Sequence, residues 1–262
     1  MNEALLSPRT GGTALELSGL TKKFKDNVAV DEVSLAIPAG SMTGLVGPNG
    51  AGKTTALSMA VGLLRPDEGT AWVGSFDVWE DPQRAKRHLG ILPDGLALPE
   101  RLTGSELLNY WGLLRGMDPA TVASRAAELL RVMELDEADH AGTLVIEYST
   151  GMRKKLGLAT ALLHRPSVLV LDEPYEAVDP VSARVLTTIL RRFIDGGGTV
   201  IISSHVMALV EQLCDRIAII SDGHVLADGT LNEVRGDDIS LEHTFISLVG
   251  ERTMKDEDLA WL

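Results

Sequence analysis

The sequence has 262 residues, of which 45% are hydrophobic and 23% charged, and its formal net charge is −13. No apolar run approaches the roughly 18 residues that a membrane-spanning helix needs, and residues 1–12 lack the pattern of a secretory signal. A strongly acidic surface repels phosphate backbones, so we expect no nucleic-acid partner. The single Cys214 excludes an internal disulfide, so we expect a reducing cytosol and a buried packing role for this thiol.

Several apolar patterns predict strands on either side of a helical middle segment. Short alternating patterns at Leu15–Ser18 and Ala29–Ile37 predict half-exposed strands. Apolar runs at Met42–Val46, Val168–Leu171 and Thr199–Ser203 predict buried strands, and a helical pattern follows each of them. Strands that alternate with helices indicate a mainly parallel sheet covered on both faces.

The segment of residues 96–165 shows helix signals and no convincing strand. One helix is expected to begin at the capping box 103–106, one to run over 118–135, and one to run from Thr150 until Pro166 stops it. We therefore predict a helical subdomain inserted between strands of the sheet.

A glycine-rich loop follows the predicted strand at Met42–Val46. Residues Gly47–Thr54 match G-x-x-x-x-G-K-[ST], between a strand and a helix, and a chance match is on the order of one in a hundred. Such a loop points its N–H groups at phosphates, while Lys53 reaches the β- and γ-phosphates and Thr54 ligates magnesium. The predicted nucleotide-binding residues here are Gly47, Pro48, Asn49, Gly50, Ala51, Gly52, Lys53, Thr54 and Thr55.

Two acids end the predicted strand Val168–Leu171. The carboxyl end of a parallel strand meets the phosphate loop at the same edge of the sheet. We therefore expect Asp172 to hold magnesium, through water, and Glu173 to act as general base on the attacking water. The alternative is that two acids end a strand by chance.

These motifs, in this order, resemble the ATP-binding subunits of ABC transporters from about Leu15 to Gly250. The family's switch histidine matches His205 in Ser203-Ser204-His205, so the resemblance implies a contact with the γ-phosphate, where a lone histidine is more often structural. The family's D-loop corresponds to Glu176–Pro180 and keeps Asp179, which also reads as an ordinary helix start.

The family's signature motif, usually LSGGQ, corresponds to Tyr148–Met152 and differs here at three of five positions. Ser149, Thr150 and Gly151 would contact ATP held by a second subunit, so the resemblance implies two ATP molecules between two copies of the chain. Without the resemblance, Ser149 is merely a helix N-cap. The stretch from Tyr148 to Pro174 is similar to the export-type, ABC-2 branch of the family.

Two further positions are assigned by the resemblance. Phe24 falls where the family places an aromatic ring that stacks on adenine, although a lone Phe between lysines also suits packing under a sheet edge. Asp94 replaces the usual glutamine of the Q-loop, and it either approaches magnesium or is a turn residue before Gly95. This replacement puts efficient coupling to a membrane partner in doubt.

The resemblance implies an α/β fold with a P-loop NTPase (RecA-like) core, an N-terminal antiparallel β subdomain and an inserted α-helical subdomain. The ABC domain is expected over 13–252, with 96–165 as its helical subdomain and 253–262 as a tail. Leu241 to Gly250 resembles the C-terminal helix of the export branch.

The leading hypothesis is an ATPase that uses ATP and Mg²⁺, forms a homodimer and drives export by a separate membrane permease from the cytoplasmic face of the membrane. The helical subdomain would form the docking surface, and Tyr110, Trp111 and Trp79 are each better candidates for core packing than for docking. The alternatives are an ABC-type ATPase not tied to transport and a weakly hydrolysing regulator. The presence of Glu173 and His205 favours an active enzyme.

Overall fold

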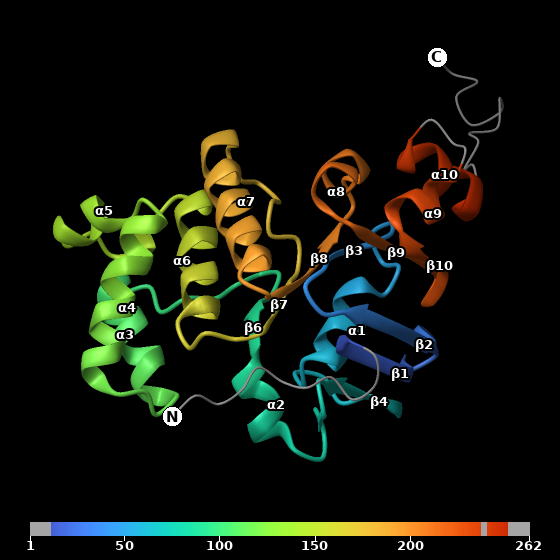
Figure 1. Cartoon of the computed structure of the whole chain (residues 1–262), viewed down its shortest axis with the longest axis horizontal. Helices are drawn as coiled ribbons and strands as arrows, with labels where there is room; N and C mark the ends of the chain where they lie inside the picture. The colour runs from blue at the N-terminus through green and yellow to red at the C-terminus, as the bar shows by residue number, and fades with distance from the viewer. Residues whose placement is uncertain (1–11, 237–239, 251–262) are drawn as a thin grey trace.

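The computed structural model describes residues 12–236 and 240–250, which form two sheets and a group of helices beside them (Figure 1). The first sheet is antiparallel, with the order β2-β1-β4-β5. Its strands are β1 (Thr13–Phe24), β2 (Asn27–Pro38), β4 (Glu68–Val73) and β5 (Phe76–Asp77). The two strands predicted near the N-terminus thus lie within the longer strands of a hairpin, and β4 and β5 were not expected.

The second sheet has the order β10-β9-β3-β8-β7-β6, and only β10 runs antiparallel to its neighbour. Its strands are β3 (Met42–Val46), β6 (Leu89–Leu92), β7 (Val168–Leu171), β8 (Thr199–Ser204), β9 (Arg216–Ser221) and β10 (His224–Thr230). The three predicted buried strands are confirmed as β3, β7 and β8. The predicted parallel sheet is therefore the centre of this fold.

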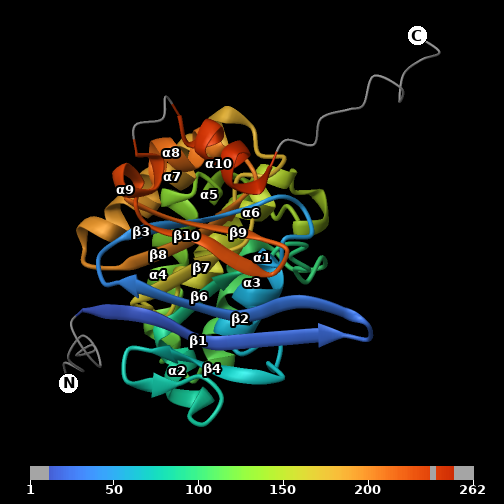
Figure 2. The same ribbon diagram turned by 90° about the vertical axis from the view of Figure 1, so that its right-hand side faces the viewer.

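The parallel sheet is apolar on both faces because neighbouring side chains of each strand enter different cores. In β7, Leu169 and Leu171 belong to the core under the helices, while Val168 and Val170 belong to the core shared with the antiparallel sheet. Figure 2 shows the two sheets one above the other. Continuous apolar runs, rather than alternating ones, are the expected sequence of such strands.

The helices lie on both sides of the parallel sheet and, in a separate group, beside it. They are α1 (Lys53–Ala60), α2 (Pro82–His88), α3 (Gly104–Leu114), α4 (Pro119–Val132), α5 (Asp136–His140), α6 (Thr150–Leu162), α7 (Pro180–Asp195), α8 (Met207–Leu213), α9 (Leu231–Arg235) and α10 (Leu241–Val249), with a 3-10 turn at Val145–Glu147. The elements α3 to α6 form the group at the left of Figure 1. Residues 96–165 contain helices and no strand, as predicted.

Two predicted helix ends are wrong by a few residues. The helix α4 ends before Leu135 because Glu134 adopts a left-handed φ of 56°, which turns the chain and buries the Leu135 side chain completely. The helix α6 likewise ends before Pro166, and Arg165, with a φ of 57°, turns the chain toward β7. Residues 253–262, the predicted tail, lie outside the described residues.

Three side-chain expectations have different outcomes. Cys214 is buried, with 5% of its surface exposed, and burial raises the pKa of its thiol to about 12. Trp79 packs against the core between the sheets, as expected. Core packing is wrong for Tyr110 and Trp111, which are 49% and 36% exposed on α3 because Leu107 and Leu108 occupy its buried face.

Candidate nucleotide-binding site

The glycine-rich loop joins β3 to the N-terminus of α1 at the carboxyl edge of the parallel sheet. Gly52 adopts a left-handed φ of 101° directly before the helix, and a Cβ added to it would lie 2.4 Å from the Ala29 carbonyl oxygen. A Cβ on Gly47 would lie 2.2 Å from the Ile220 carbonyl oxygen. Glycine is therefore required at both positions, because only its backbone fits this path.

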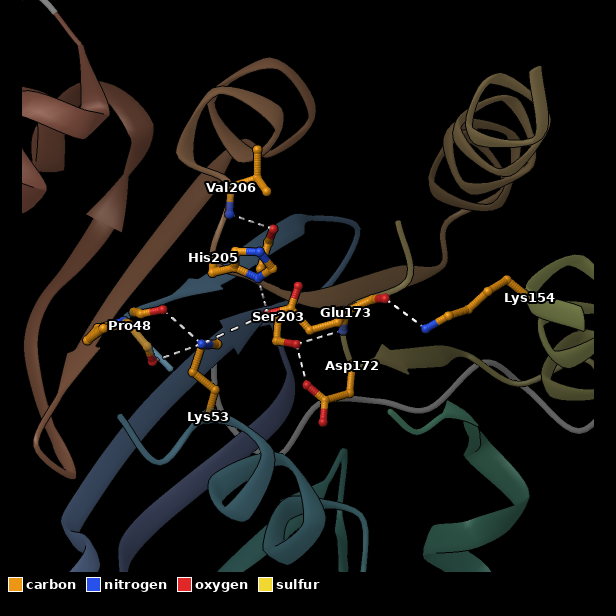
Figure 3. Close-up of polar contacts among 10 residues, drawn as sticks. Pro48, Lys53, Lys154, Asp172, Glu173, Ser203, His205 and Val206 are labelled. Carbon is orange, nitrogen blue, oxygen red and sulfur yellow. Dashed lines mark hydrogen bonds and ion pairs between the residues drawn. The ribbon is translucent and has the colours of Figure 1, made fainter. Parts of the chain in front are cut away.

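The Lys53 ammonium lies inside the loop rather than in solvent. Its Nζ donates to the carbonyl oxygens of Gly47 at 2.8 Å and Pro48 at 3.1 Å, and it lies 3.9 Å from Glu173 Oε1 (Figure 3). Burial lowers the pKa of Lys53, and the negative charges of Glu173 and Asp172 act in the opposite direction. The arrangement thus holds a cation at the point where the loop and β7 meet.

The two acids after β7 are fixed by the neighbouring strand. Ser203 on β8 donates its hydroxyl to Asp172 Oδ1 and accepts the main-chain N–H of Glu173 at 2.9 Å. Asp172 is buried, whereas the Glu173 carboxylate faces the loop, forms an ion pair with Lys53 and accepts a hydrogen bond from His205. Sequence reasoning missed this supporting contact of Ser203, because it depends on the pairing of two strands whose contacting residues are 31 positions apart.

His205 follows β8 and lies beside the Glu173 carboxylate. Its Nδ1 is 3.1 Å from Glu173 Oε1, and its side chain is 41% exposed toward the opening of the site. The register of the parallel strands explains why the glycine-rich loop, Glu173 and His205 lie close together, because Val46 pairs with Ser204 and Leu171 pairs with Ile202. The predicted cluster of Lys53, Glu173 and His205 is therefore assembled by the sheet.

A pocket of about 340 Å³ opens above this cluster. Its lining comprises Ala29, Asn49, Gly50, Ala51, Gly52, Lys53, Thr54, Thr55, Asp94, Glu173, Glu176 and His205. Sequence reasoning gave no site role to Ala29 or to Glu176, the first residue of the D-loop segment. Seven of these twelve residues belong to the glycine-rich loop, which suits a polyphosphate.

Thr54 and Asp94, whose side chains carry oxygen atoms suited to Mg²⁺, line the pocket, and the Asp172 carboxylate is near enough to act electrostatically on Lys53. Asp94 Oδ1 also accepts the main-chain N–H of Gly95 at 2.8 Å, so a turn contact exists beside the pocket position. Within 12–236 and 240–250, no group of three or more His, Cys, Asp or Glu side chains is arranged to hold a metal ion. Phosphate oxygens and water would therefore complete the coordination of Mg²⁺.

Phe24 and the signature residues lie outside this pocket lining. Phe24 ends β1 with 46% of its side chain exposed, and Lys22 Nζ is 5.8 Å from its ring centroid, so packing under the sheet edge is wrong. Ser149 caps α6, because its Oγ accepts the Met152 N–H at 3.2 Å. The helix-cap interpretation of Ser149 is thus confirmed, and its surface position is compatible with a second subunit.

The signature and D-loop segments of the same chain lie against each other. A Cβ on Gly151 would lie 2.7 Å from Ser182 Oγ and 2.9 Å from Asp179 Oδ2. Asp179 caps α7 by accepting the N–H groups of Val181 and Ser182, each at 3.0 Å, and these bonds lower its pKa. A side chain at position 151 would therefore have to displace Ser182 or Asp179.

Comparisons with known proteins agree with this arrangement. Residues 30–176 match the family described as ABC transporter. The daunorubicin/doxorubicin resistance ATP-binding protein DrrA of Streptomyces peucetius is 40% identical over 85% of this chain and 67% of its own length. The linearmycin resistance ATP-binding protein LnrL of Bacillus subtilis is 36% identical over 84% and 70%, and the Nod factor export ATP-binding protein I of Ralstonia nicotianae is 33% identical over 94% and 80%.

Solved structures show the same fold. An ATP-binding subunit of an ABC transporter superposes with a TM-score of 0.83 at 27% identity, covering 91% of this chain and 100% of that one. The ATP-binding cassette MJ0796, a dimer in a post-hydrolysis state with ADP and Pi, has a TM-score of 0.74 at 25% identity and covers 82% and 98%. None of the helices in the described part of this chain is long and apolar enough to cross a membrane. The chain thus belongs to the ABC transporter family, as an ATP-binding and ATP-hydrolysing subunit of its export-type, ABC-2 branch.

Proposed function

We propose that this ATPase binds MgATP in the pocket and drives export through a separate membrane permease. The observation that carries the proposal is that Glu173 Oε1 lies 3.9 Å from Lys53 Nζ and 3.1 Å from His205 Nδ1, beside the glycine-rich loop. The names of the relatives, which include drug resistance and Nod factor export proteins, support the export role. The subunit works on the cytoplasmic face of the membrane, held there by the permease.

In this proposal, the loop N–H groups and Lys53 bind the β- and γ-phosphates, and Phe24 stacks on the adenine. Thr54, Asp172 and Asp94 hold Mg²⁺, which neutralises phosphate charge when bound. Glu173 takes the proton of the attacking water, and His205 orients Glu173 and contacts the γ-phosphate. In this role, Lys53 Nζ leaves the carbonyl oxygens of Gly47 and Pro48 and donates to phosphate oxygens instead.

The site is one half of a composite. Ser149, Thr150 and Gly151 lie outside the pocket and would contact ATP bound by a second copy, with Asp179 at the same junction. Two copies therefore close on two ATP molecules, and hydrolysis permits opening. ATP does mechanical work in this way because it binds the closed state more tightly than the open one.

The test is Glu173→Gln in membranes that contain the permease. Removing the base while keeping the charge clamp should lower turnover by about 10²- to 10⁴-fold and trap an ATP-bound dimer. Glu137→Gln, on the exposed surface of α5, is the matched control and should behave as the wild type. A Glu173→Gln protein that stays monomeric at saturating ATP and hydrolyses normally would refute the mechanism.

A further inference from the structure

We propose that Lys154 is a positioning residue that holds the catalytic base Glu173 and links it to the signature segment. Lys154 lies on α6, one turn beyond the signature residues Ser149–Gly151. Its Nζ donates to the main-chain carbonyl oxygen of Glu173 at 2.9 Å (Figure 3). This inference rests on the proposed function, in which the signature segment contacts nucleotide held by the second copy.

Glu173 needs external support because its backbone is in an unfavourable region. Its φ is 46°, which costs free energy for a residue that carries a Cβ. Its N–H donates to Ser203 Oγ at 2.9 Å, and its carbonyl accepts from Lys154. The main chain is therefore anchored on both sides of the Cα, by β8 on one side and by α6 on the other.

The neighbouring basic residues of α6 have different partners. Arg153 donates to the carbonyl oxygen of Ile146 at 3.0 Å and pairs with Glu100. Lys155 is buried and lies 3.9 Å from Glu134. Of these three consecutive basic side chains, Lys154 is the one whose described contact reaches the end of β7.

Through this contact, a movement of α6 can change the position of the Glu173 main chain without any movement of the glycine-rich loop. A shift of α6 that follows binding of the second copy's nucleotide moves Lys154 and, through it, the carbonyl of Glu173. The base is then aligned when the signature segment is in place. A misplacement of about 1 Å at a reacting group lowers the rate on the order of 10²-fold. Loss of the one hydrogen bond from Lys154 is therefore expected to lower the rate of hydrolysis measurably.

The first test compares Lys154→Met with the wild type, using the full chain with its permease. We expect kcat to fall by about 10- to 100-fold while the KM for ATP stays within about twofold, because the pocket lining is unchanged. Arg125→Met is the matched control, since it also removes a charged donor to a main-chain carbonyl, that of Leu163 at 3.0 Å, away from the site. It should keep the wild-type kcat.

The second test restores the ammonium chemically. In Lys154→Cys, alkylation with 2-bromoethylamine rebuilds a side chain of lysine length, whereas iodoacetamide adds a neutral group. The native Cys214 is buried with a thiol pKa of about 12, so it does not compete. We expect kcat to recover with 2-bromoethylamine and not with iodoacetamide.

Two outcomes overturn the inference alone: a wild-type kcat in Lys154→Met, or equal recovery with both reagents. A wild-type protein that lacks ATPase activity and ATP-dependent dimers would instead overturn the proposed function, and this inference with it. Recovery of kcat with 2-bromoethylamine alone also excludes a folding defect, because the reagent acts on the folded protein.

Discussion

Acid should weaken the junction between α6 and β6, where the His164 side chain is half-buried. His164 Nε2 donates to the Leu89 carbonyl oxygen at 2.9 Å, and Nδ1 is buried with no hydrogen-bonding partner in the described structure. Burial, followed by the nearby positive charge of Arg115, lowers the pKa of this imidazole to about 4. A proton on Nδ1 would therefore be desolvated and unpaired.

The direction of the change in stability follows from the pKa values of His164 in the unfolded and in the folded chain. The unfolded chain binds the proton as the pH falls through about 6.5, while the folded chain stays neutral until about pH 4. The contribution of His164 to the free energy of unfolding is thus complete above pH 6.5 and is lost between these values. At about 1.4 kcal/mol for each pKa unit, the loss is about 2 kcal/mol at pH 5 and about 3.5 kcal/mol at its limit.

The assay is urea unfolding followed by circular dichroism at about pH 7 and about pH 5. His164→Gln keeps a donor for Leu89 and cannot titrate, so its stability should fall by about 2 kcal/mol less than that of the wild type over this interval. His140→Gln, on the exposed surface of α5, should show the wild-type pH dependence. An identical pH dependence in His164→Gln and the wild type would refute the reasoning.

Three further substitutions test the site. Asp94→Gln should keep ATP binding and preserve or raise turnover, and complete loss of ATPase activity in a folded protein would contradict the assigned role. Phe24→Ala should weaken ATP binding by about 1 kcal/mol, measured by calorimetry, with a smaller effect on a triphosphate that lacks a base. Gly151→Ala should lower ATPase activity by more than tenfold, because its Cβ would lie 2.7 Å from Ser182 Oγ, and normal activity would show that this junction adapts.

The central strands and the phosphate loop were predictable because their signals are local. A buried strand such as β7 is a continuous apolar run, and Gly47–Thr55 requires its residue types at fixed spacing. The strands β4, β5, β6, β9 and β10 were missed, and β6, with four residues, acquires its conformation from β7, its distant neighbour in the sheet. The pairs β4–β5 and β9–β10 are instead local hairpins, and the turn Asp222-Gly223 between β9 and β10 is a hairpin signal that sequence reasoning overlooked.

The supporting contacts of the site were not predictable for a related reason. Ser203 and Lys154 bind Glu173 from β8 and from α6, and neither contact has a sequence signature. The exposure of Tyr110 and Trp111 was also hidden, because α3 carries apolar residues around its circumference and its buried face is chosen by the packing of α4 and α6.

The double-sided packing of β7 has a consequence for how this chain can diverge. Exchange of one branched apolar residue for another at Val168, Leu169, Val170 or Leu171 alters one core by a methyl group or less. Deletion of a single residue would instead send every preceding side chain of the strand into the opposite core. It would also displace the acids that follow from their partners on β8. The length of β7 is therefore under stronger constraint than the identity of its residues. Insertions are expected to be tolerated in surface turns such as 141–144 instead.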